Sequence, residues 1–177
     1  SPAALAAAAS RKYYAYYVSL ELDGKAAGLL LSAEGGEPVL RLPDDRTAMP
    51  PTVSYEPILL RLADMTAAIY DWIDKASKNT AGPRAMSLVA ATQDLKESYR
   101  LDVQGARLTE ITLDALSATS KDLARFNLKV APAASQHRYG ASTVTKTALT
   151  KQQGLGAGNF RLYIQGLESL APRIRSV

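Results

Sequence analysis

The sequence contains no cysteine and a single histidine, His137, among its 177 residues. The missing cysteine excludes disulfide bonds, thiolate metal sites and cysteine nucleophiles. One histidine cannot build a multi-histidine metal site, and the chain also lacks the Gly-x-Ser-x-Gly segment that positions the serine of many hydrolases. His137 lies among Gln136, Arg138 and Tyr139, so we expect an exposed side chain without a functional role.

Aromatic residues and clustered charge are also scarce. Phenylalanine, tyrosine and tryptophan make up 7% of the chain, and nine of them are tyrosines, which suit half-buried strands and contact surfaces. Lysine and arginine number 21 against 17 acids, and they are spread along the chain. Because basic residues form no cluster, the pattern favours an ordinary solvated surface over sequence-specific nucleic-acid binding.

Long apolar runs are missing as well. The longest, residues 3–9, is too short to span a bilayer, so we expect no membrane partner. The first ten residues, SPAALAAAAS, lack the basic segment that precedes the apolar part of a signal peptide. We therefore interpret residues 1–12 as an N-terminal arm.

The hydrophobic content of 47% is enough for the core of one domain, or of one domain and a fragment of another. Much of it alternates with polar residues at a period of two, which predicts β-strands with one buried face. In YVSLELDGKAAGLLLSAEGGEP, residues 17–38, two such segments flank a turn at Asp23-Gly24 and end at Gly35-Gly36. The strands predicted in this way cover residues 13–22, 27–33, 38–42, 53–62, 85–92, 98–103, 107–116 and 123–130.

One segment has helical spacing instead, with apolar residues at i, i+3, i+4, i+7, i+8 and i+11. These residues are Met65, Ala68, Ile69, Trp72, Ile73 and Ala76. Asp64 or Thr66 can cap the start of the helix, and we expect Trp72 to pack in the core rather than stack on a ligand. Because strands outnumber this helix, we predict a mainly β protein of the α+β class, an antiparallel β-sandwich or barrel flanked by a single α-helix.

Two segments interrupt the strand pattern. Residues 43–52, PDDRTAMPPT, form a loop whose three prolines lack backbone donors. Residues 131–158 lose clear periodicity, apart from a strand-like stretch at 143–149. Between these segments, we expect residues 98–103 and 107–116 to pair across a turn at Gln104-Gly105, and Pro57 to mark an edge or a bulge.

No segment has a catalytic, cofactor-binding or metal-binding signature, so we expect no such residues and no cofactor. The glycine-rich GLGAGN at 154–159 precedes an alternating pattern rather than a helix, and it lacks the Lys-Ser/Thr of a phosphate-binding loop. Asp44 and Asp45 are adjacent in an extended loop, where neighbouring side chains point apart. A hydrolase remains an alternative function, and it would use carboxylates that converge from separate strands.

Four segments, in this order, resemble the tail tube proteins of contractile phages, a family that also supplies the inner tubes of extracellular contractile injection systems. The segments lie within residues 13–135 and read VSLELDG…EGGEP, YEPILLRLAD, AAIYDWIDKA and LTEITLDALSATSKDLARFNLKVA. No single motif among them is specific, and their order and spacing carry the resemblance.

The resemblance implies a small β-barrel-like sandwich with one flanking helix, and a structural role without catalysis. It further implies homo-oligomeric rings, expected to be hexamers, that stack into a hollow conduit for DNA or protein cargo. The other partners would be adjacent tube rings, sheath, baseplate or terminator proteins. Such a subunit would assemble in the bacterial cytoplasm and become a component of a virion or an extracellular injection particle.

Members of this family use the loop between their early strands to reach the adjacent ring. Here that loop would lie near residues 36–52, and it is short for the family. The short loop and the extra C-terminal arm slightly favour a specialised ring at the tube end over the main tube.

The end of the chain repeats the phase of its beginning. Val18, Leu20, Leu22 and Gly24 match Phe160, Leu162, Ile164 and Gly166. We divide the chain into an N-terminal arm (1–12), a tail-tube-like β domain (13–135) and a C-terminal arm or linker (136–177). The last part is either a free strand for a neighbour's sheet edge or the start of a second tube-like repeat, unless the match is due to chance.

Two rival functions stay open at this point. A monomeric β-domain could bind a partner or accompany cargo, with tyrosines and termini as its contacts. A hydrolase would require a concave pocket that holds carboxylic acids of raised pKa.

Overall fold

The computed structural model describes residues 17–41, 52–92, 94–117, 119, 121, 124–139 and 165. Outside this part of the chain lie the aspartates at 44 and 45, the strand-like stretch at 143–149, the GLGAGN segment and nearly all of the repeat at 160–170. The strands are β1 (Tyr17–Leu22), β2 (Lys25–Glu34), β3 (Pro38–Arg41), β4 (Thr52–Tyr55), β5 (Ile58–Leu62), β6 (Arg84–Ala91), β7 (Glu97–Leu113), β8 (Phe126–Ala131) and β9 (Ala134–Arg138), and the helix is α1 (Ala67–Ser77).

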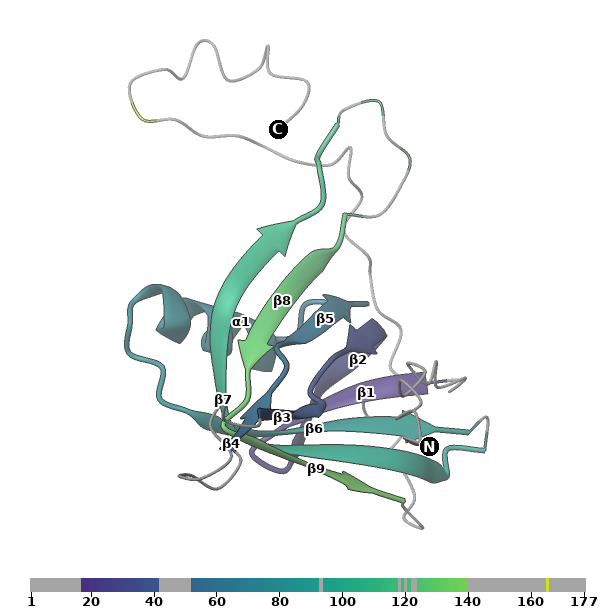
Figure 1. The fold of residues 1–177 in the computed structure, drawn as a ribbon. Coiled ribbons are helices and arrows are strands. Elements are labelled where there is room, and N and C mark those ends of the chain that lie inside the picture. The colour runs from purple at the N-terminus through teal and green to yellow at the C-terminus, as the bar shows by residue number, and fades with distance from the viewer. Residues whose placement is uncertain are drawn as a thin grey trace, which may run out of the picture.

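Six strands close into an antiparallel barrel in the order β6-β1-β2-β5-β8-β7, because β7 pairs back onto β6 (Figure 1). Inward and outward positions alternate along these strands. In β5, for example, Ile58, Leu60 and Leu62 are buried while Leu59 and Arg61 are exposed. This period of two fills the barrel with apolar side chains, and it confirms the prediction of a mainly β fold with a flanking helix.

Strand β7 closes the barrel, and here the prediction of two paired strands at 98–103 and 107–116 is wrong. Glu97–Leu113 form one strand whose first part pairs with β6 and β9, while its last part pairs with β8. The partner changes at Gly105, which has a φ of +62°. A Cβ atom at Gly105 would lie 2.7 Å from the Cβ of Ala133, so glycine is needed where the chain passes from β8 to β9.

Strand β9 lies where the sequence has no clear period. Its residues pair with Arg100–Gln104 of β7, with Ser135 opposite Val103 and His137 opposite Leu101. The strand therefore continues the sheet beyond residue 135, where the sequence pattern ended. Within the described residues, no strand pairs with the other edge of β9.

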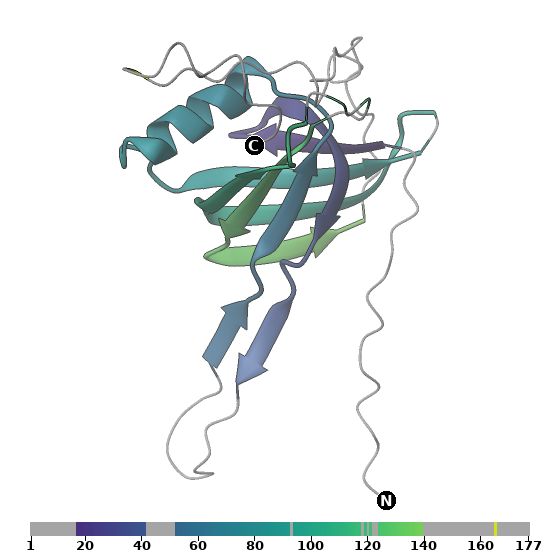
Figure 2. The ribbon, with the colours of Figure 1, turned by 90° about the horizontal axis from the view of Figure 1, so that it is seen from above.

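Helix α1 packs against the barrel beside the start of β2 (Figure 2). The Thr66 hydroxyl caps the helix by accepting a 3.4 Å hydrogen bond from the backbone nitrogen of Ile69. Ile69 and Trp72 are buried, as the helical spacing predicts, whereas Ala68 is exposed and the prediction for it is wrong. Gly28 allows the close approach, because a Cβ atom there would lie 3.1 Å from the Cδ1 of Ile69.

Candidate assembly surfaces

The β3–β4 hairpin projects away from the barrel as a separate two-stranded sheet (Figure 2). The prediction of a single strand at 53–62, with an edge or a bulge at Pro57, is wrong, because β4 ends at Tyr55, β5 begins at Ile58, and the two strands belong to different sheets. A two-stranded ribbon in water is marginally stable unless it packs against something else.

Two exposed apolar side chains lie on the same face of this hairpin. Leu40 and Val53 are cross-strand partners, and their side chains are 62% and 52% exposed. Cross-strand partners share a face of the ribbon. An apolar pair on a projecting ribbon is typical of a contact site for another protein surface.

The root of the hairpin is held by strand β9. Ser135 Oγ donates a 2.6 Å hydrogen bond to the backbone carbonyl oxygen of Gly36. Two residues further along β9, His137 Nε2 lies 3.3 Å from a carboxylate oxygen of Glu37. Strand β9 therefore connects the wall of the barrel to the start of the hairpin.

His137 is partly buried rather than exposed, which corrects the prediction from its polar neighbours. Its Nδ1 contacts the hydroxyl of Tyr99, a buried residue of β7. The ring of Tyr99 also lies edge-on to that of Tyr139, with 6.2 Å between the ring centroids. Tyr99 therefore helps to hold β9 in place through its contacts with His137 and Tyr139. Tyr139 itself is 78% exposed.

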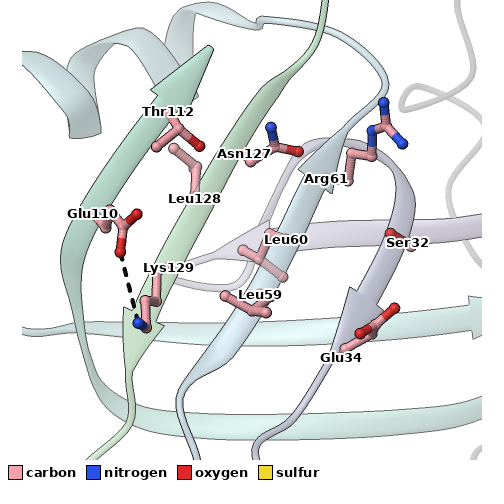
Figure 3. A pocket seen from close by; sticks show the side chains of 10 residues that line it. All are labelled: Ser32, Glu34, Leu59, Leu60, Arg61, Glu110, Thr112, Asn127, Leu128 and Lys129. Carbon is pink, nitrogen blue, oxygen red and sulfur yellow. Dashed lines mark ion pairs between the residues drawn. The ribbon is translucent and has the colours of Figure 1, made fainter. Parts of the chain in front are cut away.

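The outer face of β2, β5, β8 and the end of β7 contains a shallow hollow of about 420 Å³ (Figure 3). Lys129 and Glu110 form an ion pair of 3.6 Å across it, and Arg61 pairs with Asp114 at 3.1 Å. The side-chain hydrogen bond from Asn127, followed by the one from Arg61, lowers the pKa of Asp114. Charged side chains on this face are paired with one another, and the hollow between them is open and includes the exposed Leu59.

Two carboxylates line the hollow, Glu34 and Glu110, and Glu110 is paired with Lys129. Among the described carboxyl groups whose pKa is shifted, Asp64 is the one with a raised value, caused by burial. Its Oδ1 accepts a 3.2 Å hydrogen bond from the backbone nitrogen of Leu29, and it does not line the hollow. This environment suits a structural role, in which Asp64 joins the segment before α1 to β2.

Strands β1, β7 and β9 carry a network of ion pairs centred on Arg100. Its guanidinium pairs with Glu21 of β1 at 2.6 Å and with Glu97 at 3.0 Å. The hydrogen bonds to Glu21 and then to Glu97 raise the pKa of Arg100 above its ordinary value. Asp102, which pairs with Arg138, extends the network to β9. These contacts tie β1, β7 and β9 together.

Metal-binding clusters and membrane-spanning helices are both absent from the described part of the chain. No group of three or more His, Asp or Glu side chains there is arranged to hold a metal ion. None of the described helical residues forms an apolar helix long enough to cross a bilayer.

No protein-family model matches the sequence, and no curated protein matches it either. Solved structures do match its fold. A chain of the sheath–tube complex of the extracellular contractile injection system PVC, in its extended state, aligns with a TM-score of 0.56 and 15% identity over 73% of this chain and 95% of that chain. The tube-terminating cap of the anti-feeding prophage aligns with a TM-score of 0.55 and 16% identity, over 71% and 89% of the two chains.

Hcp1 from Flavobacterium johnsoniae aligns with a TM-score of 0.50 and 13% identity, over 72% of this chain and 99% of that one. A type six secretion system protein aligns at 0.52 and 12% identity. These identities are too low to transfer a function, whereas the alignments span nearly the whole of the matched chains. The protein therefore has the fold of the tail tube and Hcp proteins of contractile injection systems, a closed β-barrel with one flanking helix.

Proposed function

We propose that this protein is a structural subunit of the inner tube of a contractile injection system or phage tail, and that it acts without catalysis. The observation that carries the proposal is the shared fold, since 73% of this chain aligns with 95% of a chain from the PVC sheath–tube complex. In this role the chain assembles into rings, expected to be hexamers, and the rings stack into a conduit for DNA or protein cargo.

Strand β9 is the proposed edge for ring formation. Its outer edge has no strand partner within the described residues, and unpaired strand edges readily add a strand from another chain. A head-to-tail contact of this kind between identical subunits closes into a ring when the rotation between neighbours divides a full turn. Closure then removes an edge that would otherwise promote aggregation.

The β3–β4 hairpin is the proposed contact between successive rings. It projects from the barrel, and its exposed pair of Leu40 and Val53 would be covered by the neighbouring ring. Burial of this apolar area stabilises the stack by roughly 25 cal/mol for each Å² removed from water.

Sheath, baseplate or terminator proteins are the proposed further partners. The chains with the same fold come from a sheath–tube complex, a tube-terminating cap and a sheath/tube terminator. The subunit would assemble in the bacterial cytoplasm and act in an extracellular particle or virion. The N-terminal arm at 1–12 and the part of the C-terminal arm that follows β9 are proposed as additional contacts at these junctions.

Negative-stain electron microscopy together with light scattering tests this proposal. The purified chain is concentrated stepwise, and its mass is measured at each step. Rings with about six times the mass of the chain, and stacks of such rings, are the expected result. A protein that stays monomeric at every concentration, both alone and with preformed tube ends, would contradict the proposal and favour a monomeric binding module.

A further inference from the structure

The hairpin leaves the barrel through a bend that is tightly enclosed. Gly35 and Gly36 have φ values of +90° and +86°. A Cβ atom at Gly35 would lie 2.1 Å from the carbonyl oxygen of Pro57, and one at Gly36 would lie 3.0 Å from the Cδ2 of Leu101. The backbone of the bend is therefore packed against both β7 and the segment before β5.

Strand β9 supplies the polar contacts to this bend. Ser135 Oγ bonds the carbonyl oxygen of Gly36, a contact between residues 99 positions apart in the sequence. The next side chain on the same face of β9, His137, reaches Glu37 and is itself held by Tyr99. Alternate residues of a strand share a face, so Ser135 and His137 act on the bend together.

We propose that Ser135 and His137 are positioning residues, which make the orientation of the β3–β4 hairpin depend on whether the edge of β9 is occupied. This inference rests on the proposed function, because the occupant of that edge is a strand of a second copy of this chain. An edge strand bonded on one side opens locally more readily than a strand bonded on both sides. Strand addition at β9 restrains Ser135 and His137, and through them the hairpin.

The consequence is an order of assembly. In a free subunit β9 is bonded on one edge only, so it restrains the hairpin weakly. The orientation of Leu40 and Val53 relative to the barrel is then not fixed. A subunit within a ring has β9 bonded on both edges, so the hairpin is already oriented when the next ring arrives. Pre-orientation reduces the entropy lost on binding. Rings therefore form before stacks.

The test compares Ser135→Ala with a matched control, Thr109→Ala. Thr109 also donates a side-chain hydrogen bond to a backbone carbonyl, at 3.0 Å to Lys129, but it lies on β7 away from the hairpin. A second variant, Glu37→Gln, removes the charge that faces His137 and leaves the size of the side chain unchanged. Hydrogen exchange of the hairpin amides is measured in the monomeric and ring fractions, together with ring and stack counts by electron microscopy.

In the wild type and in Thr109→Ala, hairpin exchange is expected to slow when rings form. In Ser135→Ala it should stay about fivefold faster than in the control, the change that one hydrogen bond of ordinary net strength produces. Rings should persist in this variant while stacks become fewer, and Glu37→Gln should act in the same direction. Equal hairpin protection and equal stacking in Ser135→Ala and Thr109→Ala would overturn the inference.

Failure of the proposed function gives a different result. If the wild type forms no rings, the tube proposal fails. Hydrogen exchange in the monomer still tests the contact between Ser135 and Gly36. Because Ser135 bonds the bend, hydrogen exchange of the hairpin amides should be faster in monomeric Ser135→Ala than in monomeric Thr109→Ala, whether or not rings exist. The absence of this difference would show that Ser135 does not position the hairpin.

Discussion

Leu40 of β3 and Val53 of β4 lie directly opposite each other on the projecting hairpin, and both side chains are more than half exposed. In a monomer more than half of each side chain is in contact with solvent. The pair is therefore the part of the surface whose loss should affect assembly most and the fold least.

Leu40→Ser should leave the stability of the subunit unchanged, within about 0.5 kcal/mol, because the side chain is exposed. It should shorten or abolish stacks, since the apolar contact between rings is lost. Leu59→Ser is the matched control, because Leu59 is 50% exposed on the outer face of the barrel. Thermal unfolding and stack length by electron microscopy are the measurements, and equally long stacks in the two variants would contradict the role of the hairpin.

The glycine bend gives a prediction about stability. Gly35→Ala should destabilise the fold more than Gly24→Ala, although both residues have positive φ, of +90° and +75°. The strain of a positive φ applies at both sites and costs about 1–2 kcal/mol for a residue with a Cβ. At Gly35 the new atom would also collide with the carbonyl oxygen of Pro57, whereas at Gly24 nothing lies within 4 Å.

Urea denaturation of the two glycine variants gives the comparison directly. Gly24→Ala reports the backbone strain alone, and the additional loss in Gly35→Ala reports the collision. Equal losses in free energy of unfolding would mean that the bend yields to the added atom.

Much of the barrel could be predicted from local patterns. The period of two locates β1, β2, β5 and β6, and the period of 3.6 together with Thr66 locates α1, because burial of one face imposes these periods on the sequence. The turn at Asp23-Gly24 is also a local signal. These elements are located correctly because each buries one face, although Ala68 on the apolar side of α1 is exposed.

The errors arise where distant segments meet. Gly105 permits either a turn or a change of partner within one strand, and the choice depends on Ala133, which the local pattern does not reveal. His137 has polar neighbours in the sequence, yet Tyr99, 38 positions away, and Glu37 enclose it. The contact between Ser135 and Gly36 has no local signal either, so the candidate assembly surfaces required the structure.

Asp23 should contribute to stability in a pH-dependent manner. Its carboxylate accepts hydrogen bonds of 2.8 and 2.6 Å from Arg84, and these bonds are the main reason why its pKa is lowered in the folded state. A lowered pKa stabilises the fold above the unfolded value of about 3.9, and this contribution is lost as the pH falls through the folded pKa. Because the carboxylate is partly exposed, solvent reduces the size of the effect.

The free energy of unfolding is measured between pH 2 and pH 7 for the wild type and Asp23→Asn. The variant should be less stable at neutral pH, and the difference should shrink in acid as Asp23 becomes protonated. Raised salt should weaken the difference, since the pair is partly exposed. A difference that stays constant over this pH range would show that the charge of Asp23 does not contribute.

The contribution of Asp64 to stability should depend on pH in the opposite direction to that of Asp23. Burial raises the pKa of its carboxyl group in the folded state, so ionisation is more costly there than in the unfolded chain. A raised pKa means that the contribution of Asp64 to stability is complete below the unfolded value of about 3.9 and is lost as the pH rises through the folded pKa.

Asp64→Asn mimics the neutral form and keeps an oxygen to accept the hydrogen bond from Leu29. The variant should therefore be more stable than the wild type at pH 7, and the gain should vanish below about pH 4. If Asp64→Asn is instead less stable at pH 7, the charged carboxylate contributes more through its hydrogen bond than burial costs it.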